Sequence, residues 1–204
     1  MKYFVFIFLF IFSFSYNIQF GNAYKASGLA CKRSSQNKAV KDKPVKKQEA
    51  KTAYTSEEFG YCLQIPESLE VINTHNPYIF ALRFPVVAQA ANAFMVKVLP
   101  KDQYAGFEEM QKAVIESLSR EENKQIDGQV YLLDYEPMNE FKKTGPAFKV
   151  HVLDRGKEFV CCYVFAESPK AYLWIDFVAT KESYDVNFHI MRSLMQDFEI
   201  GYKP

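Results

Sequence analysis

Two adjacent cysteines are the residues in this sequence whose types most suggest chemistry. Cys161 and Cys162 lie in the apolar run EFVCCYVF, and His151 lies ten residues before Cys161. A nucleophilic thiol needs a nearby base, and the base needs a third group that holds it in place. Asp176, in the apolar run AYLWIDFVA, is the candidate for that third group. These residue types would suit a thiol-dependent enzyme that uses Cys162, His151 and Asp176.

The elements around the two cysteines decide whether such a cluster forms. Successive side chains of a strand point to opposite faces, so Cys161 and Cys162 are not expected to bind one metal ion. If the Arg-Gly turn before this run has two residues, Val150 faces Cys161 and Lys149 faces Cys162. Cys161 is then expected to pack in the core, where free cysteines are common.

The same hairpin places His151 on the face of Cys162, one diagonal away. Asp176 joins them only if the next loop aligns it with Cys162, and a one-residue change of register would move it to the other face. The competing interpretation is a chance grouping around a hydrogen-bonded histidine. Because no protease-like signature surrounds Cys162, we predict that the protein is not an enzyme.

The N-terminus has the pattern of a secretory signal peptide. Residues 1–23 contain one lysine, an unbroken apolar run of ten residues and small residues before a cleavage point at Ala23. The apolar run is shorter than the roughly 20 residues that cross a membrane. We therefore expect a periplasmic or secreted protein. Two alternatives stay open: a lipid on Cys31, which follows the letters GLA, or an uncleaved signal anchor.

Charge divides the rest of the chain into two parts. Residues 24–53 carry nine Lys/Arg and two Asp/Glu, a net charge of +7, whereas residues 54–204 carry 15 and 22, a net charge of −7. We expect the first part to be a disordered basic linker and the second a single domain. The linker would contact an anionic membrane surface or act as a solvated spacer. The acidic domain argues against specific nucleic-acid binding.

Export permits disulfides, and the four cysteines allow three fully paired connectivities. A bridge from Cys62 to Cys161 or Cys162 is the favoured single disulfide, since Cys62 lies in a strand expected in the same domain. Cys31 would then be free, lipidated or bonded to another molecule. Four reduced thiols remain the alternative.

Residues 54–204 show strand and helix periodicities in an order that predicts an α+β domain. The last two expected strands are apolar on both faces, so both faces of their sheet should be covered. Apolar spacing predicts a mid-chain helix and a C-terminal helix with Ser183 as its N-cap. The expected strands are 58–66, 78–84, 93–99, 129–136, 147–153, 158–166 and 171–179, and the expected helices are 107–123 and 183–200.

This order resembles the PsbP-like family, which includes proteins of the thylakoid lumen and of bacterial envelopes. The resemblance rests on Tyr54 and the following strand FGYCLQIP, on the mid-domain helix, and on the hairpins and helix that precede DFEI (197–200). It covers about residues 54–200. It implies an antiparallel sheet in an α/β/α sandwich and a binding or assembly role without catalysis, and it transfers no active-site residue.

Several chemistries lack the motifs that they need. The three histidines form no metal-binding spacing with each other or with the cysteines, and no Gly-rich phosphate loop or Gly-x-Ser-x-Gly elbow occurs. We therefore expect no metal and no cofactor. The sequence favours an exported, non-enzymatic binding or assembly module of the cell envelope, whose partner is a protein or envelope component. A carrier of small apolar ligands, with a pocket beneath residues 107–120, is a further alternative.

Overall fold

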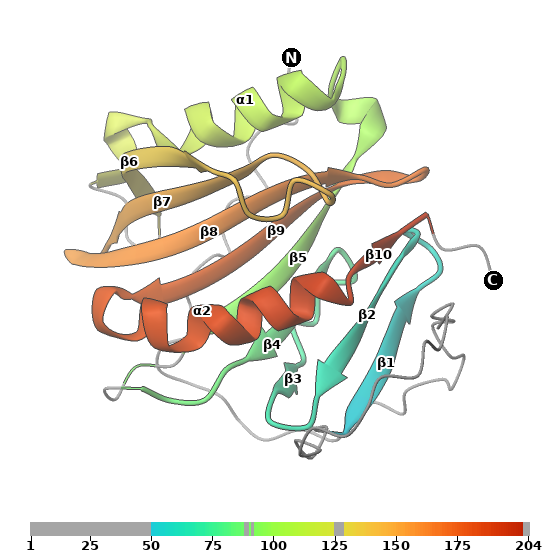
Figure 1. Ribbon diagram of the computed structural model, residues 1–204. Helices are drawn as coiled ribbons and strands as arrows, with labels where there is room; N and C mark the ends of the chain where they lie inside the picture. Colours follow the sequence, from blue (N-terminus) through green and yellow to red (C-terminus); the bar gives the residue numbers. More distant parts are fainter. Residues whose placement is uncertain (1–49, 88–89, 91, 125–128, 202–204) are drawn as a thin grey trace.

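The computed structural model describes residues 50–87, 90, 92–124 and 129–201 (Figure 1). The expected signal peptide, Cys31 and the linker up to residue 49 lie outside the described residues. Strand β1 (Lys51–Ser56) takes in the last three residues of the range 24–53.

In the described residues the strands form two antiparallel sheets. The smaller sheet has the order β1-β2-β10 and the larger one has the order β3-β4-β5-β9-β8-β7-β6. Each strand expected from the sequence is present, and the confirmed class is α+β. The remaining strands are β2 (Tyr61–Pro66), β3 (Glu70–Ile72), β4 (Ile79–Arg83), β5 (Ala93–Pro100), β6 (Val130–Met138), β7 (Ala147–Asp154), β8 (Lys157–Glu167), β9 (Ala171–Thr180) and β10 (Glu199–Ile200).

Two α-helices pack on opposite faces of the large sheet, as the PsbP-like resemblance implied. Helix α2 (Lys181–Gln196) crosses one face, and α1 (Phe107–Leu118) lies on the other side near β6 (Figure 1). Helix α1 buries Met110, Val114 and Leu118, which recur every four residues on one helical face. Short 3-10 turns, Lys101–Gln103 and Glu121–Lys124, precede and follow α1.

The large sheet therefore separates two apolar cores. Alternate residues of β8 show the division, since Val160 and Cys162 join the core beneath α2 while Cys161 and Tyr163 join the core beneath α1. We call these the α2-side core and the α1-side core. The prediction that both faces of β8 and β9 are covered is confirmed, because both strands are buried along most of their length.

The β7–β8 hairpin has the predicted two-residue turn. Arg155 and Gly156 both have positive φ, 49° and 75°, as the tight turn of a right-twisted hairpin requires. The turn sets the register, which pairs Val150 with Cys161 and Lys149 with Cys162 as predicted.

The N-cap of helix α2 lies three residues before the predicted one, and the helix ends before the predicted C-terminus. Thr180 is the N-cap, because β9 leads directly into the helix, and Ser183 is the third helical residue. The Ser183 hydroxyl oxygen accepts a hydrogen bond of 3.1 Å from the Thr180 N–H, which completes a capping box. Beyond the helix, Glu199 and Ile200 form a strand that pairs with β2.

Candidate functional site

The predicted cluster of Cys162, His151 and Asp176 does not form. The β8–β9 register pairs Cys162 with Phe177 and places Asp176 opposite Tyr163. Asp176 is therefore on the α1 side of the sheet, while Cys162 belongs to the α2-side core. The predicted alignment is wrong by one residue, and one residue is enough to reverse the face on which a side chain lies.

His151 has a different partner from the one that catalysis would need. Its Nδ1 atom lies 3.1 Å from Oε1 of Glu158, across the β7–β8 hairpin. Both side chains are partly exposed to solvent, so this is a surface contact of modest strength. The imidazole is thus oriented by Glu158 and not by Asp176.

The two adjacent thiols are free and buried. Burial, and secondarily the negative charge of Asp176, raises the pKa of both Cys161 and Cys162. A raised pKa keeps each thiol protonated at neutral pH, whereas the thiolate is the nucleophilic form. Cys161 is the core residue that the sequence predicted, and Cys162 packs in the same way on the opposite face.

The predicted disulfide from Cys62 to Cys161 or Cys162 is wrong. Cys62 is disulfide-bonded, but both thiols in β8 are free. Cys62 lies in β2 of the small sheet, whereas β8 is in the middle of the large sheet. Cys31, which we considered for lipidation, lies outside the described residues.

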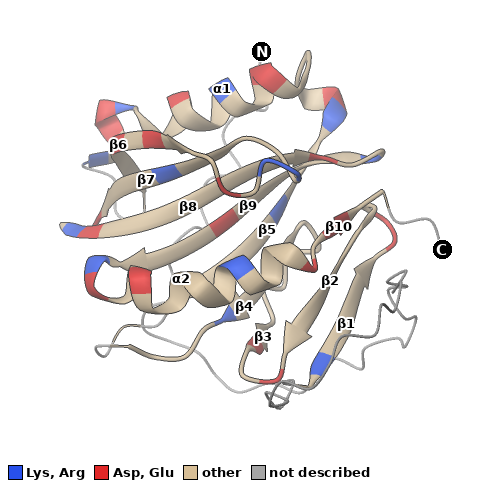
Figure 2. Ribbon diagram, in the orientation of Figure 1, with Lys and Arg blue, Asp and Glu red and all other residues tan. Residues whose placement is uncertain are grey.

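A buried ion pair on the α1 side of the sheet was missed from the sequence. Lys97 Nζ lies 2.8 Å from Oδ2 of Asp176, and both side chains are almost completely removed from solvent. Lys97 is the one charged residue of β5, and Asp176 is the one charged residue of β9 (Figure 2). Lys97 also lies over the Trp174 ring, 3.8 Å from its centroid. Burial raises the pKa of the Asp176 carboxyl, although the nearby ammonium group opposes this.

Other polar groups surround this ion pair. The Tyr163 and Trp174 rings meet edge to face, with their centroids 5.1 Å apart. Two buried atoms in the cluster have no hydrogen-bond partner: Nε1 of Trp174 and Oδ1 of Asp176. The sequence carried a signal for this site, since β5 and β9 each interrupt an apolar run with one charge, and the charges are of opposite sign.

Among the described residues, β6 is the outermost strand at one edge of the large sheet, and it exposes large apolar side chains. Leu133 and Tyr135 are 47% and 46% exposed, and Leu133 lies at a register shift between β6 and β7. The centroid of the Tyr135 ring lies 5.8 Å from that of Phe148 on β7. We call the segment from Leu133 to Pro137 the β6 edge.

The backbone of the β6 edge is protected against the addition of another strand. The Tyr135 N–H donates to the Asp134 carboxylate at 2.8 Å, so a side chain already accepts from this donor. Pro137, two residues further along, has no N–H. The backbone N–H groups of β6 point alternately towards β7 and away from it, so the donor that Pro137 lacks would lie on the outer side, as it does at Tyr135. Natural sheets use such devices to prevent pairing between edges.

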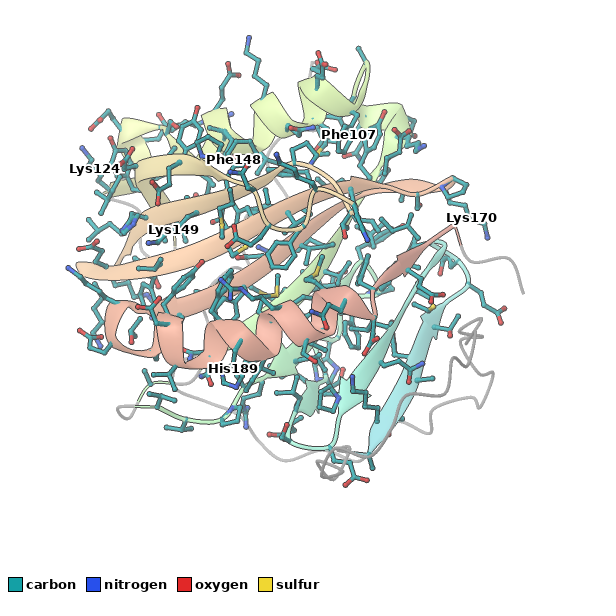
Figure 3. All side chains as sticks on the ribbon, viewed as in Figure 1. Phe107, Lys124, Phe148, Lys149, Lys170 and His189 are labelled. Atoms are coloured by element: carbon teal, nitrogen blue, oxygen red, sulfur yellow. The ribbon has the colours of Figure 1, made fainter. Side chains whose placement is uncertain are left out.

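An open depression of about 600 Å³ lies at the end of β6, lined by Glu136–Glu140 and Lys149. Its acidic groups already have counter-ions. Lys149 Nζ lies 4.0 Å from Glu136, and Arg192 Nη2 lies 3.3 Å from Glu140. Lys149 and Phe148 are consecutive residues of β7 (Figure 3). Because the charges are compensated, the depression has no excess charge that would select a ligand.

Two kinds of feature are absent from the described residues. In that part of the chain, no group of three or more His, Cys, Asp or Glu side chains has an arrangement suited to a metal ion. None of the helices among the same residues combines the length and the apolar character that crossing a membrane requires.

No protein-family model matches the sequence, and no curated protein matches it significantly. Solved structures are similar to it. They include PsbP (CyanoP) from Synechocystis, with 12% identity, coverage of 79% of this chain and 98% of that chain, and a TM-score of 0.46. The Ran-binding protein Mog1p from Saccharomyces cerevisiae has 10% identity, coverage of 75% and 96%, and a TM-score of 0.45.

LpqN, involved in cell envelope biogenesis of Mycobacterium tuberculosis, has 10% identity, coverage of 75% of this chain and 91% of that chain, and a TM-score of 0.44. The resemblance to PsbP-like proteins that the sequence suggested is thus found again among solved structures. It concerns the fold alone.

Proposed function

We propose that this chain is an exported, non-enzymatic binding or assembly module of the cell envelope, and that it binds a protein partner through the β6 edge. The signal-peptide pattern of residues 1–23 supports export. In this proposal residues 54–204, together with the start of β1 at Lys51, are one domain, and the basic residues before it, from residue 24, link it to an anionic membrane surface by their positive charge.

The arrangement of the candidate catalytic residues supports a role without catalysis. Cys162 is buried, with its pKa raised, and Asp176 lies on the other face of the sheet. His151 contacts Glu158 at the surface. A thiol-dependent mechanism would need the thiolate, the base and the orienting group on one face, within hydrogen-bonding distance.

The β6 edge is the observation that carries the binding role. Its two large apolar side chains, Leu133 and Tyr135, are nearly half exposed although strand β6 is otherwise anchored in the core through Val130 and Leu132. Tyrosine is enriched at protein interfaces, where its ring adds contact area and its hydroxyl a hydrogen bond. Because the backbone at Tyr135 and Pro137 offers no free outward donor, the partner is expected to contact side chains and not to add a strand.

The opposite edge of the same sheet provides a matched control. Val71 on β3 is 46% exposed and Tyr78 just before β4 is 47% exposed, values nearly equal to those of Leu133 and Tyr135. The double variants Leu133→Ser/Tyr135→Ser and Val71→Ser/Tyr78→Ser therefore remove similar apolar surface from the two edges.

The experiment compares both variants with the wild type, expressed with an affinity tag in the native host. Native size-exclusion chromatography of envelope extracts measures the fraction of the protein in a complex. We expect the first double variant to elute as the free protein and the second to remain in the complex. Equal behaviour of the two variants, with circular dichroism showing that both are folded, would contradict the proposed surface.

A further inference from the structure

We propose that Trp174 Nε1 and Asp176 Oδ1 form a binding site for one hydroxyl group on the α1 side of the sheet. The hydroxyl belongs to a buried water molecule or to the alcohol end of an otherwise apolar molecule. This site lies in the interior of the domain and is independent of the proposed β6 interface.

Both atoms are buried and neither has a hydrogen-bond partner. Asp176 is completely removed from solvent, and Trp174 is nearly so. Buried polar groups are almost always paired in folded proteins, because an unpaired one has lost its hydrogen bonds to water without replacement. The unpaired oxygen here belongs to the carboxylate of an ion pair, and the loss is larger for a charged group than for a neutral one.

The two atoms have complementary hydrogen-bonding roles. An indole N–H only donates, and an ionised carboxylate oxygen only accepts. Trp174 and Asp176 are two residues apart on β9 and lie on the same face. Lys97 Nζ approaches both of them, at 2.8 Å from Oδ2 of Asp176 and 3.8 Å from the centroid of the Trp174 ring, so the carboxylate and the indole lie around one ammonium group. A hydroxyl group placed between them accepts from Trp174 and donates to Asp176.

The surrounding charges select a neutral ligand. Lys97 occupies the other carboxylate oxygen and the face of the indole ring, at 2.8 Å and 3.8 Å. A cationic ligand would be repelled by Lys97 and an anionic one by Asp176, in an interior where water does not screen them.

The rest of the site is apolar and adaptable. Met95 pairs directly with Asp176 across the β5–β9 ladder, and Ala81 and Val178 belong to the same α1-side core. Methionine is unbranched and flexible, so Met95 is able to move aside for an aliphatic chain. These surroundings suit the hydrocarbon part of an alcohol or, without a ligand, a single enclosed water molecule.

The chain contains one tryptophan, so its indole N–H gives one identifiable signal in a ¹H–¹⁵N spectrum. The first measurement is a rotating-frame Overhauser contact between this proton and water in the wild-type protein. The second adds 1-hexanol and, as a matched compound that cannot donate a hydrogen bond, hexyl methyl ether. A contact to water that persists in 1-hexanol identifies a bound water. Its replacement by a contact to hexanol, but not to the ether, identifies an alcohol ligand.

The variant Lys97→Met/Asp176→Leu removes the ion pair and the acceptor while retaining Trp174. We expect it to lose the contact to water and to hexanol. A wild-type indole proton that contacts neither water nor hexanol would overturn the proposal, whether or not the variant folds. A folded double variant that keeps the wild-type contact would also overturn it, because Asp176 would then not contribute to the site.

Discussion

Removing Lys97 tests the buried ion pair most severely. The substitution Lys97→Met leaves the Asp176 carboxyl in the interior without the ammonium group that lies 2.8 Å away. Loss of one member of a buried pair costs roughly 3–5 kcal/mol. For a domain of this size each kcal/mol lowers the melting temperature by roughly 2–4 °C, so we expect a decrease of roughly 6–20 °C.

Urea and thermal unfolding, followed by circular dichroism, measure this loss. Lys112→Met is the matched control, because Lys112 pairs with Glu116 at 3.6 Å on the exposed face of α1. It should lower the free energy of unfolding by less than about 0.5 kcal/mol. The double variant Lys97→Met/Asp176→Leu should recover most of the lost stability, since it leaves no buried charge. Equal losses for Lys97→Met and Lys112→Met would refute the reasoning.

The loss caused by Lys97→Met should also depend on pH. Burial raises the pKa of the Asp176 carboxyl in the folded protein, and removal of the attracting Lys97 should raise it further. A carboxyl with a raised pKa favours folding when it is protonated, and this contribution is lost as the pH rises through the folded-state pKa. The loss should therefore shrink as the pH is lowered from about 7 towards about 4. A loss that stays constant over this range would contradict the assignment.

Further predictions concern the thiols and one glycine. Cys161 and Cys162 should react with iodoacetamide only after unfolding, because burial raises the pKa of both. Mass spectra that show either thiol labelled in the folded protein would contradict this burial. Gly145→Ala should cost about 1–3 kcal/mol in urea unfolding, because the added Cβ would overlap the backbone carbonyl of Phe165. Gly106→Ala, where nothing lies within 4 Å of the added Cβ, should cost much less, and equal costs would argue against the tight contact at Gly145.

The periodicities that depend on local geometry predicted most of the fold. The helix at Phe107–Leu118 followed from apolar residues three and four apart, and the β7–β8 register followed from a two-residue turn containing Gly156. In both cases a few neighbouring residues determine the outcome. The short strands β1, β3 and β10 were not predicted, because β1 is rich in polar residues and the other two have only three and two residues.

The candidate site depended on the register between β8 and β9, which local sequence patterns do not determine. To predict whether Cys162 aligns with Asp176, the length of the β8–β9 loop has to be known. In the structure Glu167 pairs with Tyr172 at the end of this loop, which shifts the register by one residue from the one that we assumed. An error of one residue in the register is enough to spoil the prediction, because it moves a side chain to the other face of the sheet. The predicted pairing of Cys62 with a cysteine of β8 was wrong for a related reason: the place of Cys62 in the small sheet is a property of the whole fold.

The buried pair was within reach of sequence reasoning. Lys97 and Asp176 are single charges in strands that are otherwise apolar, and a buried charge needs a partner of opposite sign. Their pairing across neighbouring strands required the strand order β5-β9, which joins segments almost eighty residues apart. The exposed side chains of the β6 edge were not predictable, because Leu133 lies at an irregularity in the β6–β7 register.

The most direct test of the binding role is site-specific photo-crosslinking in the native host. A photoreactive phenylalanine analogue replaces Tyr135 on the β6 edge or, as the control, Tyr78 at the opposite edge, two positions with nearly equal exposure. We predict that illumination gives a covalent adduct with one defined protein from position 135 and none from position 78. Adducts from both positions, or from neither, would contradict the account that this module works through its β6 edge.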